Sequence, residues 1–493
     1  MSDSPSAPDH VLDGFAYRRR VADVMVGPVV TIALGATLRE AAAALGAHRV
    51  SALAVTGGDG PVSGILTERD LVRAIARGVD LDRATVLQAM TADVATIAPD
   101  AFVYVAIGRM QRLGIRHLPV VDDGRLAGMV SARALLKLRA GQAPVIGDAI
   151  GAAETPQEMA ESLAQLPALA RAMLADGCGG HEIAAVVAGV FRDATARAVA
   201  LAEARLSDSH LGPPPAAYAF LVLGSAGRGE SLLRPDQDNA IVHAGTVADD
   251  GWFAELGRMA SDFLDAAGIP YCIGHVMASE PHWRRTLAGW RDEIGRWIAR
   301  AEGESLLNVD IFFDFQPVHG DRGLAGALRA QSLAAAARAP LFLRMMAGQL
   351  DSLSPPFNLF GRLRTDPDSG RFDAKIGALL PAVAAARIMA LATETPETGT
   401  VGRLRAAAAI GGAESGAVAE IVEAHGLVLR MLAAQQVADR AAGQPATNWL
   451  AARELPRHER EALIEALHAI DGAKLLVRDV LTAPRNGSTP AAR

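Results

Sequence analysis

The stretch AYAFLVLGSAGRGESLLRPDQDNAIVHAG, residues 217–245, decides the fold of the central part of this chain. The apolar run at residues 220–223 predicts a buried strand, and a small Gly-Ser turn at Gly224 and Ser225 follows it. Ten residues later comes Asp-Gln-Asp at residues 236–238, at the start of a second apolar run. The order strand, small turn, carboxylates and second strand predicts an α/β domain with polar groups at one edge of its sheet.

The two carboxylates of this stretch indicate a magnesium site. Asp236 and Asp238 are two residues apart, so on a strand both side chains point to the same face. Magnesium prefers oxygen ligands and uses few carboxylates, which leaves room for substrate phosphates. The turn at Gly224 and Ser225 can present backbone N–H groups to those phosphates.

This set of motifs resembles the signature of the nucleotidyltransferase superfamily that includes DNA polymerase beta and the PII-uridylyltransferases. The resemblance implies a mixed-sheet domain that uses Mg²⁺ to move a nucleoside monophosphate from an NTP to an acceptor hydroxyl. It makes Asp236 and Asp238 catalytic residues and metal ligands, and it places Gly224 and Ser225 against the nucleotide.

A third carboxylate is expected from VDIFFDF, residues 309–315, because two-metal sites clamp the attacking and leaving oxygens. Asp310 and Asp314 are four residues apart and would face the same side of a strand, so the spacing does not choose between them. The segment resembles the FFDxRPV-like motif of nucleotidyltransferase-like proteins that follow CBS pairs. This resemblance favours Asp314 as a catalytic metal ligand, and Asp310 is the alternative. Gln316 stands where that family often has Arg.

Two further charged pairs are candidates for the nucleotide site. Arg228 follows Gly224 by four residues and is expected to bind a triphosphate oxygen, with Glu230 either positioning it or approaching the metal. The alternative is a solvated ion pair, which contributes little stability. Asp373 and Lys375 resemble a D-x-K-x-G motif in the C-terminal helical domain of the same family, but we favour a surface ion pair there over a nucleotide contact.

An internal repeat precedes this domain. Val24-Met25 recurs as Ala89-Met90, 65 residues later, and each copy has the pattern of strand, helix, strand, turn, strand and helix. The repeat resembles a tandem CBS-domain pair. Such pairs commonly form dimeric discs, so the resemblance implies a homodimer.

The first copy ends in the pattern Gly-x-x-Thr-x-x-Asp, which contains Thr67 and Asp70. In CBS domains that bind adenine nucleotides, this Thr contacts phosphate or ribose and this Asp accepts both ribose hydroxyls, a role that suits a carboxylate. The alternative, which we weigh equally, is that both residues only cap the next helix. The second copy has Ser131 but Ala134 in place of the Asp, so at most one well-formed nucleotide site is expected.

The expected fold class is a multidomain α/β and α protein. Helical periodicity dominates between the repeat and residue 212, and again after residue 325. The expected organisation is a disordered tail at 1–18, a tandem CBS pair at 20–142, a helical linker at 143–212, a mixed-sheet nucleotidyltransferase domain at 213–325, a C-terminal helical domain at 326–482 and a tail at 483–493.

Composition narrows the partners and the compartment. The 493 residues carry a net charge of −7, which argues against bulk binding to nucleic acid. The two cysteines, Cys178 and Cys272, fit no metal spacing, and a reduced, cytoplasmic protein is expected. The N-terminus lacks the apolar core of a signal peptide, and no uncharged apolar stretch has transmembrane length, so no membrane association is expected. Four tryptophans, at 252, 283, 290 and 297, are expected to pack helices.

The preferred function is a signal-transduction nucleotidyltransferase. The PII-uridylyltransferase resemblance implies a protein acceptor, and the CBS pair would regulate the reaction by binding adenine nucleotide. One alternative is a catalytically inactive protein that senses nucleotides, which the missing Arg at 316 and the degenerate second CBS motif favour. Another is transfer to a small molecule, which the fused CBS pair disfavours.

Overall fold

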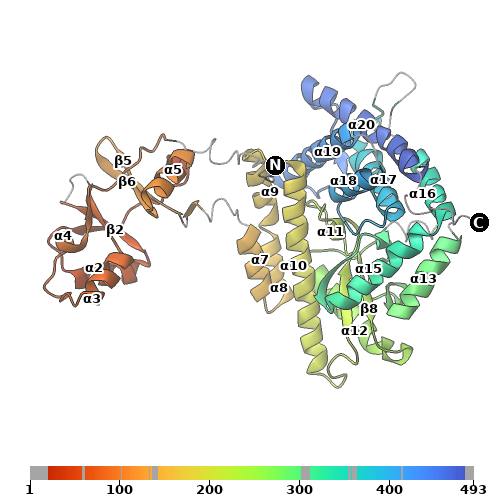
Figure 1. Cartoon of the computed structure of the whole chain (residues 1–493), viewed down its shortest axis with the longest axis horizontal. Helices are drawn as coiled ribbons and strands as arrows, with labels where there is room; N and C mark the ends of the chain where they lie inside the picture. The colour runs from red at the N-terminus through yellow and green to blue at the C-terminus, as the bar shows by residue number, and fades with distance from the viewer. Residues whose placement is uncertain are drawn as a thin grey trace, which may run out of the picture. The chain divides into compact units, whose positions relative to one another are not determined.

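The computed structural model describes residues 20–57, 62–101, 103–132, 134–135, 143–300, 311–353, 357, 363–411 and 415–482. It forms two compact units, Met1–Gln142 and Ala143–Arg493 (Figure 1), and the boundary falls where the sequence analysis ends the CBS pair. Both expected tails lie outside the described residues.

The first unit repeats one β/α pattern. Its elements are η1 (Val21–Asp23), β1 (Thr31–Ala33), α2 (Leu38–His48), β2 (Ala52–Thr56), β3 (Val62–Thr67), α3 (Glu68–Ala76), α4 (Val86–Ala89), β4 (Thr91–Ala92), α5 (Val103–Leu113), β5 (His117–Asp122) and β6 (Arg125–Ser131). The first copy contributes the sheet β1-β2-β3-β4, and the second contributes the hairpin β5-β6. Ile97 forms a parallel bridge to Val120, as β1 does with β2.

The start of each copy packs against the other copy. Met90, near the start of the second copy, lies against Gly64 of the first, and Met25, near the start of the first copy, lies against Gly128 of the second. A Cβ atom at either glycine would lie 2.6 Å from the methionine sulfur, closer than van der Waals contact allows. This reciprocal packing supports the pseudo-twofold arrangement that the repeat predicts.

The second unit begins with helices, continues as a mixed sheet and ends in a helical region. Its elements are α7 (Ala143–Ala152), α8 (Pro156–Leu163), α9 (Leu166–Ala175), α10 (Gly180–Ser207), β7 (Tyr218–Val222), α11 (Gly224–Arg228), β8 (Asn239–His243), η2 (Val247–Asp249), α12 (Asp250–Ala266), η3 (Pro281–Trp283), β9 (Arg284–Thr286), α13 (Leu287–Arg300), β10 (Gln316–Gly320), α15 (Arg322–Ala337), α16 (Pro340–Ser352), β11 (Phe372–Asp373), η4 (Lys375–Leu379), α17 (Leu380–Ala392), α18 (Thr400–Gly411), α19 (Ser415–Ala441), β12 (Trp449–Leu450) and α20 (Arg457–Thr482).

The central sheet has the order β10-β7-β8-β9. Strand β8 is antiparallel to β7 and parallel to β9, which makes the sheet mixed, as expected. Every residue of β7 and β8 is buried, consistent with the apolar runs that frame the motif. The carboxylates Asp236 and Asp238 precede β8 instead of lying on it, so the loop before the strand positions them.

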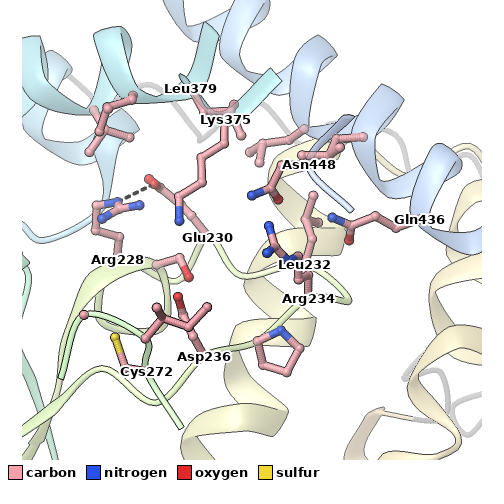
Figure 2. A pocket seen from close by; sticks show the side chains of 18 of the residues that line it. Arg228, Glu230, Leu232, Arg234, Asp236, Cys272, Lys375, Leu379, Gln436 and Asn448 are labelled. Carbon is pink, nitrogen blue, oxygen red and sulfur yellow. Dashed lines mark hydrogen bonds and ion pairs between the residues drawn. The ribbon is translucent and has the colours of Figure 1, made fainter. Parts of the chain in front are cut away.

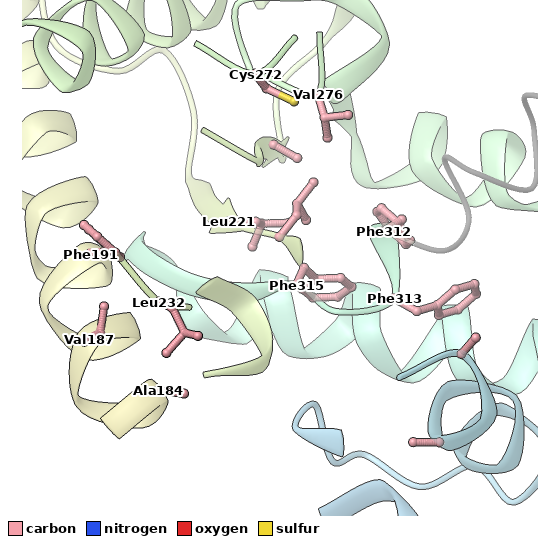
Figure 3. Packing of buried hydrophobic residues seen from close by; sticks show 14 of the residues in the cluster. Ala184, Val187, Phe191, Leu221, Leu232, Cys272, Val276, Phe312, Phe313 and Phe315 are labelled. Atoms are coloured by element: carbon pink, nitrogen blue, oxygen red, sulfur yellow. The ribbon is translucent and has the colours of Figure 1, made fainter. Parts of the chain in front are cut away.

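The segment that contains Asp314 is not the core strand that its apolar sequence predicts. Its first residues end a helix and turn, and the strand β10 begins only at Gln316. The phenylalanines of this turn, Phe312, Phe313 and Phe315, fill the core (Figure 3). Phe312 stacks on Trp290 with a centroid distance of 4.8 Å. The four tryptophans are all buried, so their expected packing role is confirmed.

Residues 143–212 do not form a separate linker. The long helix α10 packs against α12 beside the sheet and against α19 of the C-terminal helical region. Its buried face, which includes Val187 and Phe191, belongs to one apolar core that continues through both regions (Figure 3). Burial of this face removes apolar surface from water, which stabilises the compact arrangement.

The C-terminal helical region surrounds an apolar helix. The window Lys375–Ala392 is long and apolar enough to cross a membrane by length and composition, but 72% of it is buried inside the protein. Helix α17 packs against α16, α18 and α20, and this packing accounts for its apolar character.

Candidate functional site

A pocket of about 370 Å³ lies between the sheet region and the C-terminal helices. Ser225, Arg228, Glu230 and Asp236 line it from the sheet side, and Lys375 from the C-terminal region (Figure 2). Its other lining residues are Leu232, Arg234, Pro235, Pro270, Tyr271, Cys272, Ile273, Gly274, Leu379, Leu380, Val383, His425, Leu429, Leu432, Gln436 and Asn448.

The Gly-Ser turn brings β7 and the carboxylate loop together at this pocket. Gly224 has φ 55°, a left-handed conformation that glycine adopts without steric cost. A Cβ atom at this position would lie 2.3 Å from Oδ2 of Asp238. The backbone N–H of Leu223 donates to the Asp238 carbonyl at 2.8 Å. Both the conformation and the close approach therefore require glycine.

We expect Gly224→Ala to weaken Mg²⁺-dependent NTP binding at least tenfold because the new methyl group displaces the Asp238 carboxylate. The left-handed backbone alone costs about 1–2 kcal/mol for a non-glycine residue. Gly229→Ala is the matched control, since its φ is 74° and its nearest neighbour would be 3.5 Å away. Calorimetry and denaturant unfolding separate the effects: both variants should lose stability, and only Gly224→Ala should lose binding. Equal binding by both variants would contradict this prediction.

Asp236 and Asp238 come together as the sequence predicts. Burial and the neighbouring Asp236 raise the pKa of Asp238 to about 7, and Asp238 also makes a hydrogen bond with the thiol of Cys272. Two close carboxylates in a low-dielectric site repel each other, and a cation relieves that repulsion. The pair fits Mg²⁺, which commonly uses one or two carboxylates together with substrate phosphates. No group of three metal-ligating side chains occurs among the described residues.

Asp314 does not join this pair, and its expected role as a metal ligand is wrong for this structure. Its side chain is completely buried. Arg387 Nη2 and Arg403 Nη1 donate to its two oxygens at 2.7 and 2.6 Å, and Arg228 Nη1 donates at 2.5 Å. The three guanidinium groups outweigh the effect of burial and hold the pKa of Asp314 below its usual value. The carboxylate therefore acts as an ionic link between the sheet region and α17 and α18. Asp310 lies outside the described residues.

Arg228 and Glu230 form a buried pair, so the solvated-pair alternative is wrong. Arg228 Nε donates to Glu230 Oε2 at 2.8 Å (Figure 2), while Glu230 Oε1 accepts from the Thr400 N–H at 2.6 Å. Glu230 and Asp314 thus fix the orientation of Arg228, which still lines the pocket. Gln316 does not line this pocket: its side chain donates to Thr398 at 2.7 Å.

Two other cations face the same pocket. Lys375 lines it, instead of forming the favoured surface pair with Asp373, whose Oδ1 accepts from the Ile376 N–H at 3.0 Å. Arg234 also lines the pocket, two residues before Asp236 (Figure 2). In the described part of the chain, neither Lys375 nor Arg234 has a carboxylate within ion-pair distance. Both are exposed and suit phosphate oxygens. The sequence analysis missed Arg234, although its place beside the Asp motif was a signal.

The first unit contains a second cavity, of about 630 Å³. Thr67 and Asp70 line it together with Arg69, Arg73 and Arg116. They also cap α3, since the Thr67 N–H and hydroxyl donate to Asp70 Oδ2 at 3.0 and 2.7 Å. Thr67 and Asp70 therefore cap the helix and also line the cavity.

The second CBS copy keeps only the capping function. Ser131 Oγ accepts from the Ala134 N–H at 3.1 Å, and Ala134 provides no carboxylate. His117 of this copy instead lines the cavity of the first motif, with Nε2 at 3.0 Å from Ser51 Oγ. The cavity is thus built from both copies.

A histidine pair that the sequence analysis did not identify lies in the second unit. His181 of α10 and His425 of α19 are 244 residues apart, with Nε2 of the first 3.0 Å from Nδ1 of the second. Burial lowers the pKa of His425 to about 4, so the imidazole is neutral at physiological pH. No local pattern joins two residues so distant in the chain.

Comparison with protein families agrees with this architecture. Residues 21–77 and 86–141 match the CBS domain. Residues 164–304 match the family described as "Putative nucleotidyltransferase DUF294", and residues 340–480 match the "Putative nucleotidyltransferase substrate binding domain". The fold and the site thus define a nucleotidyltransferase-like protein that carries a CBS pair. The chain combines this CBS pair with a domain of the DUF294 nucleotidyltransferase type and with the C-terminal domain described as its substrate-binding domain.

Individual relatives match the CBS pair. A homoserine O-acetyltransferase of Methanococcoides burtonii is 34% identical over 131 residues, which is 26% of each chain. An uncharacterized 17.7 kDa protein of Acidianus ambivalens is 36% identical over 24% of this chain and 71% of its own. A solved CBS domain protein of Pyrobaculum aerophilum in complex with AMP is 32% identical, with a TM-score of 0.23, over 25% of this chain and 94% of its own. The chain spans about a quarter of the acetyltransferases' length.

Proposed function

We propose that the second unit binds Mg²⁺-NTP and transfers its nucleoside monophosphate to an acceptor hydroxyl. The observation that carries the proposal is that Asp236, Arg234 and Lys375 line one pocket, while Asp238 lies close to Asp236 and against the Gly224 turn. The carboxylates would hold Mg²⁺, which would neutralise phosphate charge and polarise the α-phosphorus. The oxygen of the acceptor hydroxyl would form a bond to the α-phosphorus while the bond between that phosphorus and the leaving pyrophosphate breaks, and the hydroxyl proton would pass to solvent.

The pocket residues account for nucleotide positioning without further groups. Lys375 and Arg234 are suited to the β- and γ-phosphates as charge-assisted donors. Arg228, held by Asp314 and Glu230, offers a fixed positive charge that needs no reorganisation during transfer. The resemblance to PII-uridylyltransferases supports a protein acceptor. The CBS-pair resemblance supports a homodimer, and the two cysteines without metal-ligand spacing support a cytoplasmic protein.

The test is a transfer assay with the four NTPs labelled at the α-phosphorus. The full chain and Mg²⁺ are incubated with a lysate depleted of the chain, and labelled products are separated by size. We expect label from one preferred NTP on a protein band, together with stoichiometric pyrophosphate release. Binding of Mg²⁺-NTP without label on any protein or small molecule would favour the alternative function, a nucleotide sensor. One observation favours the nucleotide sensor: Asp314 pairs with three arginines, so only two carboxylates, Asp236 and Asp238, are left to hold the metal.

We also propose that the first unit binds an adenine nucleotide in the cavity around Thr67 and Asp70. Arg69, Arg73 and Arg116 would meet the phosphates, and Asp70 would accept the ribose hydroxyls. The match to the CBS family and the cavity's composition support this. Such binding would regulate the second unit if the two sites have a coupling free energy.

We expect Asp70→Ala to weaken AMP and ATP binding to the first unit at least tenfold. The substitution also removes a helix cap, which costs about 1 kcal/mol. Gln88→Ala is the matched control, since Gln88 Oε1 accepts from the Thr85 N–H at 2.9 Å in a similar cap outside the cavity. Calorimetry should show loss of binding in Asp70→Ala alone. Equal affinity in the two variants would leave Asp70 with a capping role only.

A further inference from the structure

The C-terminal region contributes an apolar wall to the pocket. His425, Leu429, Leu432 and Gln436 follow one another at spacings of three and four residues along α19, so they share one helix face. All four line the pocket, and Leu379 and Val383 line it from η4 and α17. Aliphatic side chains are poor partners for phosphate and good partners for a flat, uncharged ring.

His425 is a polar group within this wall that has spare hydrogen-bonding capacity. The side chain is fully buried, and its Nε2 has no hydrogen-bond partner in the described part of the chain. Its Nδ1 is 3.0 Å from His181 Nε2, and the two rings stack with a centroid distance of 5.2 Å. The contact with His181 fixes the orientation of the His425 ring. A buried polar atom without a partner destabilises the folded protein, and a ligand that bonds to it would remove that cost.

Gln436 cannot take over that role, because its amide supports the fold. Its Oε1 accepts from the Leu233 N–H at 2.8 Å, and its Nε2 donates to the Thr447 carbonyl at 2.9 Å. These bonds hold the loop that leads to Arg234 and Asp236 against α19. The wall is therefore in a fixed position relative to the carboxylates.

We propose that this wall is the nucleobase subsite of the pocket, with Leu429 and Leu432 against the ring and His425 Nε2 as hydrogen-bond partner of its edge. The proposal rests on the proposed function and adds the part of the site that distinguishes one NTP from another. A nucleobase is a planar heteroaromatic ring with donors and acceptors on its edge. It matches a wall that is apolar on its face and carries one neutral polar atom.

The experiment compares four Mg²⁺-NTPs with Mg²⁺-tripolyphosphate, a probe that has the phosphates and no base. Each ligand is titrated calorimetrically into the full chain carrying Asp70→Ala, which weakens binding at the first unit. The same titration into a chain that also carries Asp236→Asn and Asp238→Asn serves as the blank. The difference between the two heats measures binding that depends on the Asp pair. In the Asp70→Ala background we expect His425→Ala to weaken the preferred NTP about tenfold and to narrow the differences among the four. Tripolyphosphate affinity should change less than about twofold. His425→Gln, which keeps hydrogen-bonding groups, should restore part of the discrimination.

Four results would overturn the proposal. If His425→Ala lowered the affinities for NTP and tripolyphosphate equally, His425 would act in phosphate binding or in the fold. If His425→Ala left the affinity differences among the four NTPs unchanged, the wall would contact another ligand, such as the acceptor. NTP that binds no more tightly than tripolyphosphate would exclude a base subsite while leaving the proposed function intact. If neither probe gives heat that depends on the Asp pair, the proposed function fails and this inference falls with it.

Discussion

Replacing Asp236 and Asp238 together by Asn is expected to reduce nucleotidyl transfer at least about 10³-fold and to abolish Mg²⁺-dependent NTP binding. Bound metal is worth several kcal/mol of transition-state stabilisation, and each 1.36 kcal/mol corresponds to about tenfold in rate. Asn keeps the shape of Asp but removes the charge that attracts the cation. The measurements are label transfer from the α-labelled NTP and calorimetric titration with and without Mg²⁺.

Stability provides an independent readout for the same variant. Because the two carboxylates repel each other, their neutralisation should not lower the free energy of unfolding and is expected to raise it slightly. Asp292→Asn, at a position with a side chain 68% exposed on α13, is the matched control and should leave transfer and binding unchanged. Mg²⁺-dependent binding that survives in the Asn variant would contradict the site, because the other carboxylate that lines the described pocket, Glu230, is already bonded to Arg228 and to the Thr400 N–H.

Asp314→Asn is expected to destabilise the second unit by about 3–5 kcal/mol, the range seen when one partner of a buried ion pair is removed. The substitution leaves Arg228, Arg387 and Arg403 without their shared carboxylate in a fully buried position. Guanidinium groups remain protonated in proteins, so the cluster cannot neutralise itself. The measurement is the midpoint of denaturant unfolding followed by tryptophan fluorescence, which reports the second unit because all five tryptophans lie there.

The control for this variant is an exposed pair. Glu461→Gln removes the partner of Arg457, at 2.8 Å and with the Glu side chain 55% exposed, and should cost at most about 0.5 kcal/mol. If Asp314→Asn cost no more than this control while Mg²⁺ binding was lost, Asp314 would be a metal ligand after all.

The pH dependence of the Asp314 variant follows from the lowered pKa. A carboxylate with a folded pKa below its unfolded value contributes stability above the unfolded pKa, about 3.9, and loses it as the pH falls further. The difference in stability between the wild type and Asp314→Asn should therefore be constant from pH 5 to 8 and shrink below about pH 4. A difference that changed near pH 7 would assign the effect to another group.

The sequence by itself determined the modules and the local parts of the site. The apolar runs around the Gly-Ser turn predict β7 and β8, the repeat predicts the paired CBS copies, and Thr67 with Asp70 predicts both a cap and a cavity lining. Each of these predictions depends on periodicity or on residues a few positions apart. Strand and helix geometry alone determines how such residues are arranged. The DxD spacing predicted that Asp236 and Asp238 lie close together, but the loop before β8 positions them and not the strand geometry that the prediction used.

Only the tertiary structure decided how distant groups pair. Asp314 meets Arg228, Arg387 and Arg403 across 86, 73 and 89 residues, and His181 meets His425 across 244. A motif shows that a carboxylate is present but not which charges surround it once water is excluded. Burial makes an unpaired charge costly, so the arginines of α11, α17 and α18 form ion pairs with the Asp314 carboxylate. The chemistry of the pocket therefore follows from packing as much as from the motif that marks it.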